Sequence, residues 1–411
     1  MVDSPSPHSG PLRQHPPFVL FWLTRVCATV AFQALAVAVG WQVYALTSSP
    51  FQLGLVGLVQ FLPSVLFFLA AGHVADRYDR RTVLRLCQLT EGTVAATLAL
   101  GTAQGWLTTE IIFALVFVFG AARAFESPTL QSLLPTIVPA EMFPRAVAGS
   151  ASANQTATII GPALGGLLYA IGPVFAYGFC AASFAMAALI VTFITVERPA
   201  PPREPPTLAT LLAGVTFIRR NPLVLGAISL DLFAVLLGGA TALLPVFARD
   251  IFAAGPWALG LLRAAPAVGA LSMSVALARW PLQRHVGRTM FMSVAVFGAA
   301  TILFALSRWL PFSFVMLIVL GAADVISVVI RMTLVQTNTP TAMLGRVSAV
   351  NSLFIGTSNQ LGEFESGVTA AWFGTIPAVV LGGVGTIFVV LIWIRLFPQL
   401  LRADKLAMVE R

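Results

Sequence analysis

The chain has 411 residues, of which 58% are hydrophobic and only 10% are charged. A soluble domain carries about 25% charged residues, so 16 acids and 24 bases cannot build a water-facing surface for a chain of this size. The composition therefore excludes a soluble globular protein. It indicates that lipid is the solvent for most of the chain.

Apolar segments recur along the whole sequence. A helix that crosses the hydrocarbon needs roughly 20 mostly apolar residues, because that layer is about 30 Å thick. The first segment is too long, and follows too few bases, for a cleavable signal peptide. The sequence predicts an all-α membrane protein with twelve transmembrane helices, at 18–46, 51–74, 83–103, 110–133, 146–170, 173–196, 222–247, 257–278, 289–307, 311–333, 347–371 and 377–397.

The net charge of +8 is unevenly distributed. Sixteen of the 24 bases fall in the N-terminus, the even-numbered connections or the C-terminal tail, and Arg85 and Arg395 lie at the adjoining helix ends, whereas only Arg249 and Arg308 fall in the opposite loops. The positive-inside rule then predicts that both termini are cytoplasmic. We interpret the basic balance as an orientation signal of a multi-pass protein in a bacterial inner membrane, and we expect no nucleic-acid partner.

Two matches within the chain indicate an internal duplication. Residues 120–122 (Gly-Ala-Ala) recur as residues 321–323, at an offset of 201, and further identical residues follow at the same offset. Pro50, Leu53 and Gly54 recur around residues 256–260, at an offset of 206. Repeats of this kind set the architecture of many transporters. We therefore expect two pseudo-symmetric bundles of six helices.

The segment between the halves contains five prolines in ten residues, Glu197–Pro206, and favours an extended linker. The spacing of apolar residues over 207–220 predicts a short amphipathic helix on the cytoplasmic surface. The predicted parts are a cytoplasmic N-terminal tail, a first six-helix bundle, a cytoplasmic linker, a second six-helix bundle and a cytoplasmic tail, at 1–17, 18–196, 197–221, 222–397 and 398–411.

The loop after the second predicted helix reads GHVADRYDRR, residues 72–81. It resembles the signature loop of the major facilitator superfamily, roughly G-x-x-x-D-R-x-G-R-R, although Asp79 stands where that family often has glycine. The resemblance implies a twelve-helix fold and a cytoplasmic gate. The alternative is that the charges only anchor the loop at the membrane face. The gate residues would be Gly72, Asp76, Arg77, Arg80 and Arg81.

A second motif lies in the fifth predicted helix, GPALGG at residues 161–166. It is similar to the antiporter motif of drug-exporting members. The resemblance implies that Gly161, Pro162, Gly165 and Gly166 bend the helix and allow close contact with a neighbouring helix, which we expect to come from the other half. The alternative is ordinary packing of small residues.

Residues 25–54, together with ADRYDRR, resemble the subgroup of enterobactin and macrolide exporters. Many relatives have a Gly-Asp pair in the first helix, but this chain reads Ala31-Phe32-Gln33 there. A coupling role for that aspartate is therefore not transferred to this chain.

Charges at mid-bilayer cost about 2.5–3.5 kcal/mol on insertion scales, so each one suggests a site or a structural pair. Among the charges inside the predicted helices, the candidates are Arg25, Glu91, Arg123, Glu126, Asp231, Arg263, Asp324, Arg331, Glu363 and Glu365. The resemblance implies that the first, fourth, seventh and tenth helices line a central cavity. The candidates for the substrate cavity are Arg25, Gln33, Arg123, Asn154, Asn359 and Gln360.

Asp231 is the first candidate for proton coupling, because no base lies within a helical turn and a lone desolvated carboxylate can bind and release protons near neutrality. The alternative is a structural pairing with Arg25 or Arg123, whereas Arg331 is expected to reach the cytoplasmic interface. Further candidates for proton coupling are Glu126, Asp324, Glu363 and Glu365.

Each of the other candidates also has a structural alternative. Arg123 and Glu126 are three residues apart and can neutralise each other on one helix face. Arg263 is a possible companion of the acids at 363 and 365. Interhelical amide bonds are an alternative role for Asn154, Gln155, Asn359 and Gln360.

The sequence predicts a secondary active transporter, specifically a proton-coupled exporter of an amphiphilic organic molecule, a drug-like compound or a siderophore, that works by alternating access. The alternatives are a proton-linked importer or lipid flippase on the same fold and, more remotely, a non-transporting receptor or scaffold. No P-loop, HExxH or GxSxG motif is present, and the three cysteines form no CxxC pair. We expect no enzyme activity, cofactor or metal, and a monomer whose partners are the bilayer, a small molecule and protons.

Overall fold

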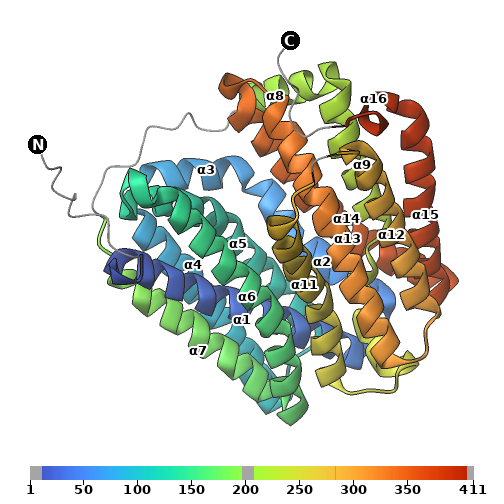
Figure 1. Ribbon diagram of the computed structural model, residues 1–411. Coiled ribbons are helices and arrows are strands. Elements are labelled where there is room, and N and C mark those ends of the chain that lie inside the picture. Colours follow the sequence, from blue (N-terminus) through green and yellow to red (C-terminus); the bar gives the residue numbers. More distant parts are fainter. Residues whose placement is uncertain (1–11, 197–207, 283, 405–411) are drawn as a thin grey trace, which may run out of the picture. The chain divides into compact units, whose positions relative to one another are not determined.

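The computed structural model describes residues 12–196, 208–282 and 284–404, and these residues form helices joined by short connections (Figure 1). Within these ranges there is no strand, and the predicted all-α class is confirmed. The outer parts of the predicted tails, 1–11 and 405–411, and most of the Pro-rich linker, 197–207, lie outside the described residues.

The first half of the chain contains a 3-10 turn, then α1 to α5, a second 3-10 turn and two further helices. Their bounds are η1 Leu12–Gln14, α1 Pro16–Thr47, α2 Pro50–Leu66, α3 Phe68–Arg77, α4 Arg80–Gln104, α5 Thr109–Ile137, η2 Ala140–Met142, α6 Phe143–Ile171 and α7 Pro173–Thr192.

The second half begins with the short α8, which confirms the helix predicted in the linker. Its elements are α8 Leu208–Arg220, α9 Pro222–Leu237, η3 Ala240–Leu243, α10 Leu244–Val246, η4 Phe247–Ile251, α11 Pro256–Arg279, α12 Val286–Leu306, α13 Leu310–Thr337, α14 Thr341–Phe373, α15 Thr375–Leu396 and α16 Pro398–Leu401.

Eight helical segments of the described chain are by themselves long and apolar enough to cross a bilayer. The other four predicted crossings correspond to α2 with α3, to α4, to α6 and to α14. The second crossing is interrupted at Phe67, between α2 and α3. The other three are continuous helices of 25 to 33 residues whose polar side chains lower their mean hydropathy.

The seventh predicted crossing is a broken helix, in which α9 ends at Leu237 and a 3-10 turn and a π-helix follow. Gly238 and Gly239 occupy the break. A Cβ on Gly239 would overlap the backbone of Gly362 on α14. The break therefore lets two backbones come into contact, which an uninterrupted helix with side chains would prevent.

Residue contacts divide the chain into two compact units. One consists of residues 1–42 and 59–206, the other of residues 43–58 and 207–411. This division falls between residues 206 and 207, and residues 43–58 group with the second unit, although the sequence assigns them to the segment 18–196. One cause is glycine packing, because a Cβ on Gly54 would lie only 3.0 Å from the Cα of Gly367 on α14.

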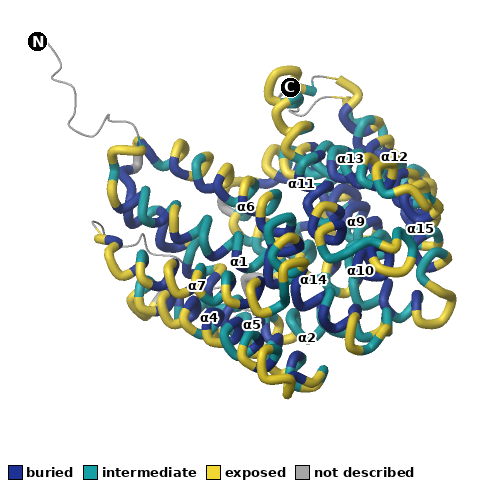
Figure 2. Tube along the Cα trace, turned by 90° about the horizontal axis from the view of Figure 1, so that it is seen from below, coloured by how far each residue is buried: buried dark blue, intermediate teal, exposed yellow. Residues whose placement is uncertain are grey.

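Each unit has its own apolar core, and Figure 2 shows buried residues running along several helices of both. In the first unit, Phe21, Leu84, Leu133 and Val191 bring α1, α4, α5 and α7 together. The corresponding core of the second unit is built by α9, α12, α13 and α15. Burial of such side chains is what fixes the helices of a unit against one another.

The repeat read from the sequence recurs in the packing inside each unit. Gly120 on α5 leaves no room for a Cβ because it lies against the carbonyl of Gln60 on α2. Gly321 on α13 lies in the same way against the carbonyl of Pro266 on α11. Gln60 and Pro266 are separated by the offset of 206, and the two glycines by the offset of 201. The same helix contact is thus built twice.

Candidate functional site

The first unit buries a cluster of charged side chains. On α5, Arg123 forms an ion pair with Glu126, one turn further along the same helix face. The Glu126 carboxylate is fully buried, and the Arg123 guanidinium lies over the ring of Phe32, 4.4 Å from its centroid. The pairing predicted from the spacing of three residues is therefore present, and a cation–π contact with α1 supports the arginine.

Helix α4 contributes two more polar groups to this charged cluster. The amide nitrogen of Gln88 donates to Glu126, at 3.5 Å. Glu91 follows one turn later and is 0% exposed, and the described residues offer neither of its carboxyl oxygens a hydrogen bond. Glu91 was one of the intramembrane charges read from the sequence but not one of the site candidates, because no spacing links it to the acid 35 residues away on α5.

Arg25 lies near the cluster on α1, and its Nη1 donates to the hydroxyl of Ser150 on α6 at 2.9 Å. Arg25 is also within electrostatic reach of Arg123 and Glu126. Three sequence-predicted residues, from α1 and α5, therefore come together in one unit. Asn154, on α6, is half-buried and shows no contact with this cluster in the described structure.

The antiporter-like motif packs α6 against α1. A Cβ on Gly161 would lie 2.6 Å from the Cβ of Gln33, and a Cβ on Gly165 would lie 2.6 Å from the Cα of Ala34. The expected close helix contact is present, but its partner helix lies in the same unit. Gln33 thus lies at a helix–helix contact, and Pro162 and Gly166 are also buried.

In the second unit, Asp231 on α9 forms a buried ion pair with Arg331 on α13. The side chains are 7% and 2% exposed, respectively. The expectation that Asp231 is a lone carboxylate is therefore wrong, as is the expectation that Arg331 reaches the membrane interface. The two residues are 100 positions apart and meet only because α9 and α13 pack together. The reason for choosing Asp231 as the proton carrier is lost.

The acids of α14 have separate environments. Glu363 lies beside Gly57 on α2, where a Cβ would come within 2.7 Å of its Oε2. Arg263 on α11 is near enough to act on Glu363 electrostatically, although no ion pair between them is found in the described residues. Glu365 accepts a hydrogen bond of 2.7 Å from Thr369, one turn along its own helix. The two acids do not form one site.

The remaining polar candidates are not gathered into a cluster. Asn359 donates to the carbonyl of Ile355 on its own helix, at 2.9 Å, so an interhelical role for it is not seen. Gln360 keeps a buried amide oxygen that finds no hydrogen bond among the described residues. Asp324, on α13, is half-buried, and no ion pair to it occurs in the described part of the chain.

The charged residues between α3 and α4 cap α4 and form hydrogen bonds to α5 and to the segment after α7. Asp79, which replaces the usual glycine, accepts from the backbone N–H of Arg81 at 3.2 Å and caps α4. Arg81 donates to the carbonyl of Ile194 beyond α7, and Arg80 donates to Ser132 on α5. The side chain of Asp76 lies outside the described residues.

The structure also gives the exposure of two further members of the predicted gate. Arg77, the last residue of α3, is exposed, and Gly72 is half-buried. Partial burial raises the pKa of Asp79, but hydrogen bonds and the positive charge of Arg81 lower it by more, so this pKa lies below its usual value.

Sequence reasoning missed a cluster at the end of α1. The Tyr44 hydroxyl donates to the carboxylate of Asp250 on η4. Arg249 donates to the backbone carbonyl of Tyr44 at 3.1 Å, and its guanidinium lies 5.5 Å from the centroid of the Tyr44 ring. All three residues belong to the second unit. Arg249, for which the sequence predicts no partner, therefore contacts the end of α1.

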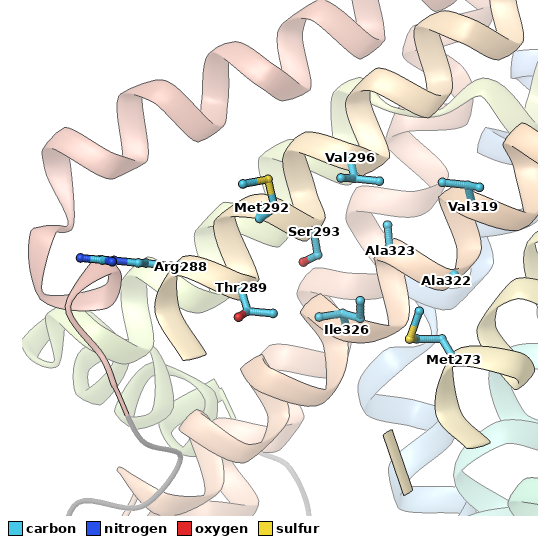
Figure 3. Close-up of a pocket in the computed structure, with 10 residues that line it drawn as sticks. All are labelled: Met273, Arg288, Thr289, Met292, Ser293, Val296, Val319, Ala322, Ala323 and Ile326. Carbon is cyan, nitrogen blue, oxygen red and sulfur yellow. The ribbon is translucent and has the colours of Figure 1, made fainter. Parts of the chain in front are cut away.

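The second unit also has an open groove of about 510 Å³ between α11, α12 and α13 (Figure 3). Its walls are mainly apolar, and its polar members are Arg288, Thr289 and Ser293, all on α12. Such a lining suits an apolar or amphiphilic molecule. None of the substrate-cavity residues predicted from the sequence lines this groove.

The comparisons with known proteins agree with this architecture. The family described as "Transmembrane secretion effector" matches residues 6–410. The enterobactin exporter EntS of Citrobacter koseri is 30% identical over 405 residues, covering 95% of this chain and 94% of that protein. EntS of Escherichia coli is 28% identical over 406 residues, covering 96% and 97%.

Solved structures show the same fold at low identity. A bacterial homologue of the human lysosomal transporter Spinster, in an inward-facing and occupied conformation, has a TM-score of 0.74 at 14% identity, covering 95% of this chain and 97% of that one. The nucleoside transporter NupG has a TM-score of 0.67 at 15% identity, covering 93% and 99%. These relatives are multi-pass membrane transporters and not enzymes. The chain belongs to the transmembrane secretion effector family of major facilitator transporters, with two sets of six helices.

Proposed function

We propose that this protein exports an amphiphilic organic molecule, such as a siderophore or a drug-like compound, from a bacterial cell in exchange for protons. It works by alternating access in the inner membrane, with both termini in the cytoplasm. The direction and the substrate class are supported by the enterobactin exporters that it resembles over 94% and 97% of their length. The coupling ion is supported by the carboxyl groups buried in the transmembrane helices.

The observation that carries proton coupling is the charged cluster of the first unit. A mid-membrane carboxyl costs several kcal/mol unless it is paired or has a function. Glu126 is paired with Arg123, but Glu91 beside it is not paired in the described residues. A buried acid without a partner adds nothing to the stability of the helix bundle, so a role in proton transfer accounts for it better than a structural role does.

Transport into inside-out membrane vesicles tests the proposal. Vesicles energised to an acid interior are given a catecholate siderophore or a macrolide, with vesicles that lack the protein as the control. Accumulation that collapses when a protonophore is added is the expected result. Accumulation in right-side-out vesicles instead would favour the importer, and movement of a labelled phospholipid between leaflets would favour the flippase.

A further inference from the structure

In the described part of the first unit, the charged cluster holds two buried acids, of which only Glu126 is in an ion pair. Arg123 is engaged by Glu126, and Arg25 donates to Ser150. Glu91 lies beside Glu126 and has no base of its own in the described part of the chain. Two carboxyl groups that lie together share one proton more readily than both ionise, because like charges at short range repel.

The unsatisfied hydrogen-bond acceptors of the cluster also favour a shared proton. Three buried oxygens lack a donor in the described structure, namely both carboxyl oxygens of Glu91 and the amide oxygen of Gln88. A buried acceptor without a donor is costly. A proton on Glu91 turns one of these acceptors into a donor for the neighbouring carboxylate, so one of the three oxygens gains a partner.

Among the described residues, no other neighbour of Glu91 is found to supply a charge. Cys87 lies one turn earlier on α4. From α7, the residues next to this part of α4 are Phe184, Ala181 and Ala185, which pack against Gly92. Within the described residues, the charged and titratable groups that face Glu91 are therefore Glu126 and Arg123 from α5 and Cys87 from its own helix.

We propose that Glu91 and Glu126 share a single proton, carried by Glu91, and that this pair is the proton-binding site of the protein. The site itself is inferred from the geometry of the first unit alone. That it couples proton flow to substrate movement rests on the proposed function.

The geometry also indicates what loss of this proton changes. With both carboxylates ionised, Arg123 alone cannot neutralise them, and the other base within electrostatic reach of Glu126 is Arg25. Arg25 now ties α1 to Ser150 on α6. Deprotonation draws Arg25 toward the acids and weakens this tie, so the proton state of the pair controls a contact between α1 and α6.

Infrared difference spectroscopy of the purified protein, titrated from acid to alkaline pH, tests the site without any substrate. The wild type is expected to show the carbonyl band of a protonated, buried carboxylic acid that persists after ordinary carboxyls have ionised. Glu91→Gln removes this band. Glu110→Gln, at a solvent-exposed carboxyl in the first turn of α5, is the matched control and leaves the band intact.

Two results would overturn the proposal, provided that the variant melts as a folded protein. One is a band that survives Glu91→Gln. The other is a wild-type spectrum that responds to sodium at constant pH and not to pH, which would make the cluster a cation site. A band that disappears in Glu91→Gln together with pH-independent transport by the wild type keeps the proton site and rejects proton coupling, so the two failures are distinguishable.

Discussion

The Asp231–Arg331 ion pair gives the sharpest stability prediction. Both side chains are almost inaccessible, at 7% and 2% exposed, and the Nε of Arg331 has no hydrogen-bond partner in the described residues. Asp231→Asn therefore leaves a buried guanidinium without a counter-charge. Removing one member of a buried pair costs about 3–5 kcal/mol, whereas replacing both members with apolar residues of similar size is often neutral.

The assay is unfolding of the purified protein in mixed micelles by titration with a denaturing detergent. Asp231→Asn and Arg331→Met are each expected to lower the free energy of unfolding by about 3–5 kcal/mol, and the double variant Asp231→Leu with Arg331→Met is expected to recover most of the loss. The reasoning fails if Asp231→Asn stays within about 1 kcal/mol of the wild type, or if the double variant is as unstable as the sum of the single ones.

Three further predictions rest on other contacts. Gly120→Ala and Gly321→Ala each force a Cβ into a neighbouring carbonyl and should lower the melting temperature. Gly178→Ala, whose added Cβ meets nothing within 4 Å, should leave the melting temperature unchanged or raise it slightly. Equal melting temperatures of all three variants would refute the repeated contact. Because its pKa is lowered in the folded state, Asp79 stabilises the start of α4 above about pH 4, and this stabilisation is lost as the pH falls through the folded pKa. Asp79→Ala should therefore destabilise the first turn of α4 by about 1 kcal/mol at pH 7 and by nothing at low pH, as measured by hydrogen exchange of that turn. A destabilisation that does not depend on pH would contradict the capping role. Tyr44→Phe should speed hydrogen exchange near residues 43–49 about five-fold, as expected for loss of about 1 kcal/mol, and unchanged exchange would show that the bond to Asp250 contributes nothing.

Much of the fold could be predicted from the sequence because apolar length and turn residues are local. The breaks inside the second and seventh crossings were not predicted. The break at Gly238 and Gly239 exists because the backbone of α14 needs space there, and that requirement is not local. Helices α4, α6 and α14 are not among the eight segments that are apolar enough by themselves, yet the recurring segments of the sequence predict all three.

The candidate site was less predictable, because pairing across helices leaves no spacing signal. Arg123 and Glu126 are on one helix and were foreseen as a pair, whereas Asp231 and Arg331 were not. The repeat offers a signal that could have been used. At its two offsets, Arg25 corresponds to Asp231 and Arg123 corresponds to Asp324. The two halves thus place charges of opposite sign at equivalent positions, so each half needs its own partners.

Proton movement itself tests the central claim most directly. Purified protein is reconstituted into liposomes that contain a trapped pH-sensitive dye, and substrate is added to the outside with no imposed gradient. Exchange predicts that substrate entry through the transporter drives protons out, so the lumen becomes more alkaline. The same experiment with Glu91→Gln should give no pH change. Acidification of the lumen, or substrate entry with no movement of protons in the wild type, would contradict proton-coupled export.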